Sequence, residues 1–255
     1  MSVKEKAKHI LMELKGHAPF TLFGALLGIF FMLVFKNTSV ATSHRLFTIF
    51  HPAHVVLSAM VTASMFKLHS TKKRFLLVLL IGFFGSIGIA TLSDIIIPHF
   101  GSEVLGLDVP THAQIHEQGE SSAEMGVHSS EAEHHGAKIH LGFIEEWYIV
   151  NPAAFLGILI AYFLPRTKFP HAGHILVSTW ASSSYLLMNL GREITGGAVA
   201  GIFVILFIAT WLPCCISDIV FPLLFVKSDI EVAVPCPIHD RHSHPHIHTE
   251  PEEDK

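Results

Sequence analysis

Six long apolar runs, separated by polar connections, dominate the pattern of hydrophobic and polar positions along the chain. They cover residues 18–35, 46–66, 75–98, 147–164, 169–190 and 197–226. A helix needs about 20 mostly apolar residues to cross the hydrocarbon core of a membrane. The runs lack the two-residue alternation of membrane strands. The pattern therefore predicts an all-α integral membrane protein with about six transmembrane helices, the last of which is kinked or broken at Pro213 or Pro222.

The basic residues predict how these helices are oriented. Thirteen of the 17 Lys and Arg residues lie in the N-terminal segment, in the second and fourth connections and in the C-terminal tail. The opposite side carries only Lys36, Arg45, Lys138 and Arg192. Because basic residues collect on the cytoplasmic side, we expect both termini in the cytoplasm and the protein in an inner or plasma membrane.

The two halves of the chain carry matching motifs. His51 and His54 recur 120 positions later as a second His-x-x-His pair, and the serines that follow them recur at the same offset. The matching residues of the second half are His171, His174, Ser178 and Ser184, which correspond to His51, His54, Ser58 and Ser64.

Two further matches occur in the same order along the chain. Asp94 and Asp218 stand in Ser-Asp-Ile segments that are 124 positions apart, and each is followed by a proline four residues later. Gly24 and Gly157 match at an offset of 133. Three matches, one per helix, predict two three-helix repeats at residues 17–98 and 147–226. Since each repeat has an odd number of helices, the second enters the membrane from the opposite side, which is the inverted topology of many transporters.

Three polar segments flank these repeats. Residues 1–16 are expected to form a cytoplasmic amphipathic helix. Residues 99–146 form an acidic, His-rich loop that the predicted orientation places outside the cytoplasm. Residues 227–255 form a Pro- and His-rich tail that we expect to be disordered and cytoplasmic.

Composition and missing motifs exclude several function classes. Charged residues make up only 15% of the chain and the net charge is −4, which disfavours a soluble enzyme and a nucleic-acid partner. The sequence has no His-Glu-x-x-His, no Gly-Lys-Ser/Thr and no Cys-x-x-Cys-His, so a zinc protease, an ATPase and a covalent haem protein are disfavoured. Twenty histidines remain as the main functional signal.

Imidazole and carboxylate ligands suit divalent transition metals such as zinc, nickel, cobalt, iron or manganese. Residues three apart share one helical face, so each His pair points in one direction. We expect two metal-binding groups near opposite membrane faces, one of His51, His54 and Asp94 and the other of His171, His174 and Asp218. Each Asp is either a ligand or orients a His.

Other residues have candidate roles around these groups. Ser58, Ser64, Ser178 and Ser184 are candidates for lining the path between them, although serines inside membrane helices also simply let helices pack closely. Cys214 and Cys215 precede Asp218 by one turn; small buried apolar residues are the favoured interpretation, and a soft metal ligand is the other. The tail histidines predict metal buffering, and they are His239, His242, His244, His246 and His248.

The function predicted from the sequence is secondary transport of a divalent transition-metal cation through the lipid bilayer, with proton exchange as a natural coupling and no enzymatic activity. The His pairs and aspartates would form the gates, and the metal would be the substrate rather than a resident cofactor. Two alternatives stay open: a membrane redox protein with haem or di-iron held by the histidines, and a carrier or channel for a non-metal solute. A six-helix chain is compatible with a complete carrier or with half of a homo-oligomer.

Overall fold

The computed structural model describes residues 3–69, 75–107, 146–165, 168–189, 196–216 and 220–221. Over these ranges the chain is helical and contains no strand. The elements are α1 (Val3–Phe35), α2 (Val40–His69), α3 (Phe75–Thr91), the π-helical turn η1 (Leu92–Ile96), α4 (Ile97–Val104), α7 (Trp147–Phe163), α8 (Lys168–Asn189) and α9 (Gly196–Cys215). The prediction of an all-helical chain is confirmed for this part of the protein.

Four of the described helical segments are long and apolar enough to cross a membrane. They are Lys15–Phe35, Val40–Leu68, Phe75–Val104 and Gly196–Cys214. Large apolar side chains such as Phe23, Phe30 and Phe84 are more than half exposed on these segments, as lipid-facing side chains would be. α7 is apolar but only 17 residues long, and α8 carries many polar side chains. The structure thus supports membrane insertion with four candidate spans, where the sequence predicts six.

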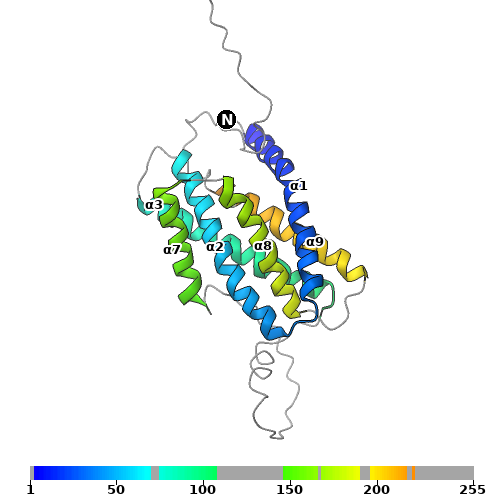
Figure 1. The fold of residues 1–255 in the computed structure, drawn as a ribbon. Coiled ribbons are helices and arrows are strands. Elements are labelled where there is room, and N and C mark those ends of the chain that lie inside the picture. Colours follow the sequence, from blue (N-terminus) through cyan, green and yellow to red (C-terminus); the bar gives the residue numbers. More distant parts are fainter. Residues whose placement is uncertain are drawn as a thin grey trace, which may run out of the picture.

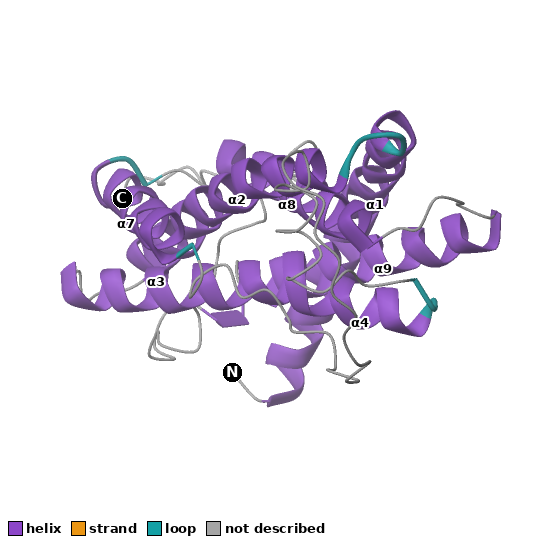
Figure 2. Ribbon diagram, turned by 90° about the horizontal axis from the view of Figure 1, so that it is seen from below, coloured by secondary structure: helices purple, strands orange, loops and turns teal. Residues whose placement is uncertain are grey.

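The helices form two layers (Figures 1 and 2). In one layer α2 and α8 pack side by side, with α7 against α2 and α1 against α8. The second layer contains the continuous segment of α3, η1 and α4 together with α9, and α9 lies beside α4 and also contacts α1 and α8. This arrangement places α2 and α8 at the centre of the molecule.

Contacts along the helices set their directions. Phe47, early in α2, lies against Tyr185, late in α8, whereas His54 lies against His174, so the two central helices are antiparallel. Each half contributes one of these two helices. Inverted repeats require such a pair to run in opposite directions.

Two matched glycines make equivalent contacts in the two halves. A Cβ on Gly24 would meet Ile175 and Thr179 of α8 at 3.4 and 3.3 Å. A Cβ on Gly157 would meet the carbonyl oxygen of Val56 and, at 2.8 Å, the side chain of Ala59, both in α2. Thr179 and Ala59 are themselves 120 positions apart, which is the offset of the His pairs. The sequence match between the halves is therefore accompanied by a match in packing.

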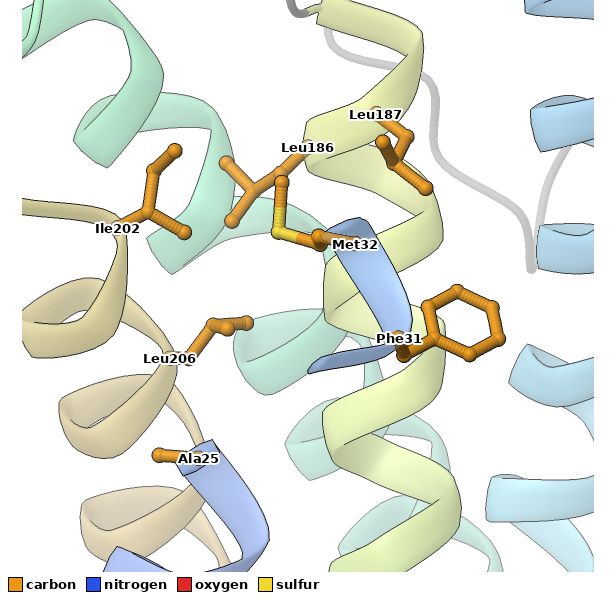
Figure 3. Close-up of a cluster of buried hydrophobic side chains, with 7 residues drawn as sticks. All are labelled: Ala25, Phe31, Met32, Leu186, Leu187, Ile202 and Leu206. Atoms are coloured by element: carbon orange, nitrogen blue, oxygen red, sulfur yellow. The ribbon is translucent and has the colours of Figure 1, made fainter. Parts of the chain in front are cut away.

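Two apolar clusters hold the flanking helices to the central pair. One joins α1, α8 and α9, and Figure 3 shows Met32 of α1 reaching toward Leu186 of α8 beside Ile202 of α9. The other joins α7, α2 and α3 through residues such as Phe66, Val78 and Ile158. Each cluster thus packs the central helix and the last helix of one half against the first helix of the other half. Burying these side chains stabilises the contact by about 2 kcal/mol for each large residue when the reference is water, and by less in lipid.

Several predicted boundaries differ from the structure. The sequence predicts a loop at residues 99–146, but the third segment continues as a helix to Val104. Pro98 does not end it, because Pro98 stands in the first turn of α4, where its missing N–H is not needed. The first helix starts at Val3, so residues 3–16 continue into the span instead of forming a separate helix. The last regular helix ends at Cys215, two residues after Pro213, and the tail at residues 227–255 lies outside the described residues.

Candidate metal centre at the middle of the helix layers

A π-helical turn positions Asp94. The turn spans Leu92–Ile96 between α3 and α4, and the N–H of Ile97 bonds to the carbonyl oxygen of Leu92, five residues earlier. Such an inserted residue widens the helix locally and is frequent at functional sites. It directs Asp94, which is fully buried, toward α2 and α8.

Four side chains donate hydrogen bonds to the two oxygens of Asp94. Oδ2 accepts from Nδ1 of His51 at 2.9 Å and from Nδ1 of His54 at 2.7 Å. Oδ1 accepts from Oγ of Ser93 at 2.8 Å and from Oγ of Ser178 at 3.0 Å. The prediction that the His pair and Asp94 act together is thus supported by geometry. The carboxylate is used by these four donors, which favours an orienting role over a ligand role.

The carboxylate also fixes the form of both imidazoles. An ionised carboxylate can only accept, so Nδ1 of His51 and of His54 carries a proton, and in the neutral imidazole Nε2 then carries the lone pair. Both rings are fully buried, and neither Nε2 has a hydrogen-bond partner among the described residues. A carboxylate behind the Nδ1 and an open Nε2 is the usual arrangement of a metal-binding histidine.

The His pair of the second half reaches the same place. The rings of His54 and His174 stack with centroids 4.7 Å apart and an angle of 19° between their planes. His171 lies 6.2 Å from His174, centroid to centroid. The two His pairs therefore do not lie near opposite faces, as the sequence pattern predicts, because antiparallel packing of α2 against α8 brings His54 and His174 together.

Cys214 of α9 joins this contact. One ligand atom each of His54, His174 and Cys214 lies within 4.8 Å of the others, and all three side chains are buried. Sequence reasoning favoured a packing role for Cys214. The contact depends on how α9 crosses α2 and α8, which residue spacing does not show.

Asp218 lies outside the described residues, so its predicted role stays a prediction. Its two flanks are described, and Ile216 and Val220 both have π-helical geometry. They stand 124 positions after Leu92 and Ile96, the two ends of η1. The two described flanks of Asp218 thus share the geometry of the two ends of η1, and residues 217–219 lie outside the described residues.

The four predicted path-lining serines are all fully buried. Ser178 contacts the site through Asp94, whereas Ser184 donates to the carbonyl oxygen of Trp180 in its own helix. The Oγ of Ser64 has no hydrogen-bond partner within the described ranges. A path along them stays a prediction, and the tail histidines (residues 239–248) lie outside the described residues.

Two further buried histidines, which the sequence does not predict as site residues, lie close to the residues described above. His17 of α1 lies against His171 with ring centroids 4.7 Å apart. His99 of α4 has its Nδ1 3.1 Å from the hydroxyl of Tyr185 and its Nε2 3.6 Å from half-exposed Glu103. His17 has no counterpart in the repeat that could indicate it, and the helix end that the sequence predicts at Pro98 places His99 in the loop.

Comparison with protein-family models, with curated proteins and with solved structures gives no match for this chain. The function is therefore argued from the site itself.

Proposed function

We propose that this chain is a secondary transporter for a divalent transition-metal cation. The observation that carries the proposal is the buried group of His51, His54 and Asp94, with His174 of the other half stacked on His54. In this proposal His54 and His174 bind the metal, and Asp94 holds the imidazoles in their metal-binding form.

A metal explains the group better than packing does. A buried nitrogen without a partner costs about 1–3 kcal/mol, and His51 and His54 each contribute one. In a purely structural His, both ring nitrogens are expected to form hydrogen bonds, because buried polar atoms in proteins nearly always have a partner. A cation bound at Nε2 removes this cost and is neutralised in part by Asp94.

Transport is favoured because the site lies between the two halves. His54 comes from the first half and His174 from the second, and both are fully buried. Carriers with inverted repeats hold their substrate between the repeats and expose it to each side in turn. The paired glycine contacts and the paired π-helical geometry support such a repeat in this chain.

The proposal includes six spans. α8 is too polar to resemble a membrane helix on its own, but its polar side chains are buried against other helices, including Ser178, Thr179, Ser182 and Ser183. Polar residues inside a membrane are usually turned to a protein interior or a substrate path. We therefore assign α7 and α8 to the membrane as well, with both termini on the cytoplasmic side.

The proposal is tested by metal entry into proteoliposomes that contain a metal-sensitive dye. Zinc, cobalt, nickel, manganese and iron(II) are added outside, and protein-free liposomes are the control. We expect entry of at least one metal, and a pH-sensitive dye in parallel vesicles reports any proton exchange. No entry of any metal into vesicles that contain folded protein would contradict transport, and an absorption spectrum would then test for bound haem or di-iron.

A further inference from the structure

We propose that Cys214 is a third metal ligand beside His54 and His174, and that this His₂Cys site selects thiophilic divalent metals such as zinc, cobalt and cadmium. The identity of this metal as transported substrate rests on the proposed function. The binding site itself is argued below from geometry and charge.

The three residues come from three helices that meet at one point. Cys214 is 1% exposed and follows Pro213 in the last turn of α9. The ligand atoms of the group lie within 4.8 Å of one another. Around a tetrahedral ion with bonds of about 2.0–2.3 Å, ligand atoms stand roughly 3.5 Å apart. The side chains would thus move closer by about an ångström on binding, which small rotations of three side chains can supply.

A buried cysteine alone is most often a small apolar residue. The second observation here is its neighbour: His54 is fully buried, and its Nε2 has no hydrogen-bond partner among the described residues. Its Nδ1–H is donated to Asp94, so Nε2 is the lone-pair nitrogen of the neutral imidazole. Cys214 therefore lies beside a buried imidazole whose Nε2 has no hydrogen-bond partner among the described residues.

The charges of the described residues balance when this site is loaded. A divalent ion brings two positive charges, a Cys214 thiolate brings one negative charge and Asp94 brings another, while His54 and His174 are neutral. An uncompensated charge inside a membrane is costly, so a loaded site with no net charge lowers the barrier to moving through the bilayer. Without Cys214, the same group would carry one excess positive charge.

The sulfur ligand then sets the metal preference. Thiolates and imidazoles favour zinc, cobalt and similar ions, whereas manganese and magnesium prefer oxygen ligands. Three protein ligands leave the fourth tetrahedral position open, as in zinc sites that exchange a ligand. We expect manganese to bind at least about 100-fold more weakly than zinc.

The test is a titration of the purified full-length protein with Co²⁺ under reducing conditions, followed by absorption. A cobalt–thiolate bond gives a near-ultraviolet charge-transfer band that His ligands alone do not give. The chain has three cysteines, so Cys214→Ser is compared with the matched controls Cys215→Ser and Cys236→Ser. We expect the band in the unchanged protein and in both controls, its loss in Cys214→Ser, and its displacement by zinc but not by manganese.

Either of two results would overturn the proposal: a folded protein that gives no thiolate band, or a band that is lost in Cys236→Ser and kept in Cys214→Ser. His54→Ala is expected to lose the band while leaving Cys214 in place, which separates metal coordination from damage to the thiol. A thiolate band without metal entry into liposomes would contradict transport alone. Metal entry without the band would contradict the sulfur ligand alone.

Discussion

Asp94 is the residue on which the other members of the site depend. Its two oxygens accept from two imidazoles and two serine hydroxyls that belong to α2, η1 and α8. The carboxylate thus joins the two halves of the chain and fixes which nitrogen of each His is open. In this respect it resembles the carboxylates that orient histidines in metalloproteins, whose loss weakens metal binding about 10- to 100-fold.

We expect Asp94→Asn to weaken zinc binding by about 10- to 100-fold, measured by competition with a chromophoric chelator. The amide would offer only one oxygen to four donors, so at least one imidazole would lose its orientation. Glu103→Gln is the control, because Glu103 is half exposed and lies 3.6 Å from His99 rather than from the site. Equal affinities for Asp94→Asn and the unchanged protein would show that the carboxylate does not orient ligands.

Ser178 and Ser184 distinguish support of the carboxylate from lining of a path. Ser178→Ala removes a hydrogen bond to a buried carboxylate, which is worth about 1.5–3 kcal/mol, so we expect weaker zinc binding and a lower melting temperature in detergent. Ser184→Ala removes only a bond within its own helix and is expected to change neither. If both substitutions slow metal entry equally and leave zinc affinity unchanged, the two serines act as a path.

The sequence indicates some of this site and not the rest. The His-x-x-His spacing and the repeat pointed to His51, His54 and Asp94 as one group, because side chains three apart share a helical face. The sequence does not show that His54 and His174 stack, because this contact depends on where two antiparallel helices cross. The contact of Cys214 was missed for the same reason, and the irregular turn at Asp94 has no pattern of its own in the sequence.

The helices are positioned by close contacts at small residues. Gly157 lets α7 approach the backbone of α2 at Val56, and Gly28 lets α1 approach Thr179 and Ser183 of α8. Membrane helices associate through such contacts because lipid offers no hydrophobic driving force between them. The apolar runs predicted where helices lie, since length and hydropathy are local properties. They placed α3 and α4 less well, because a π-helical turn carries the chain past Pro98.

A matched pair of glycines tests this packing. Gly157→Ala would place a methyl group against the carbonyl oxygen of Val56 and against Ala59. Because the carbonyl oxygen belongs to the backbone, this clash can be relieved only if α7 moves away from α2. We expect lower thermal stability in detergent and weaker zinc binding. Gly88→Ala is the control, because nothing lies within 4 Å of its Cβ, and alanine is favoured over glycine in a helix by about 0.5–1 kcal/mol. A Gly157→Ala protein as stable as Gly88→Ala would contradict the close approach of the two helices.

The whole molecule is organised around the two central helices. α2 and α8 run in opposite directions, α2 packs against α7 and α8, α8 packs against α1 and α2, and His54 and His174 stack where the two central helices meet. A line of polar aromatic side chains leads from His17 through His171 and His174 to His54, and His99 with Tyr185 lies beyond Phe47 and His51.

The most direct test of the account is the initial rate of zinc entry into proteoliposomes with His54→Ala and with His174→Ala. Both side chains belong to the central site, but they come from different halves of the chain. If the two halves share one site, each substitution alone abolishes zinc entry. This loss is larger than the decrease of about 10- to 100-fold expected for a residue that only orients a ligand. His44→Ala is the matched control on α2, because His44 is partly exposed and lies near Glu146. A protein that lacks residues 236–255 is the second control, and we expect this deletion to change only the affinity for zinc or the regulation of entry. Zinc entry that is lost in both site variants and kept in both controls is the result this account predicts. Unchanged entry in either folded site variant would contradict it.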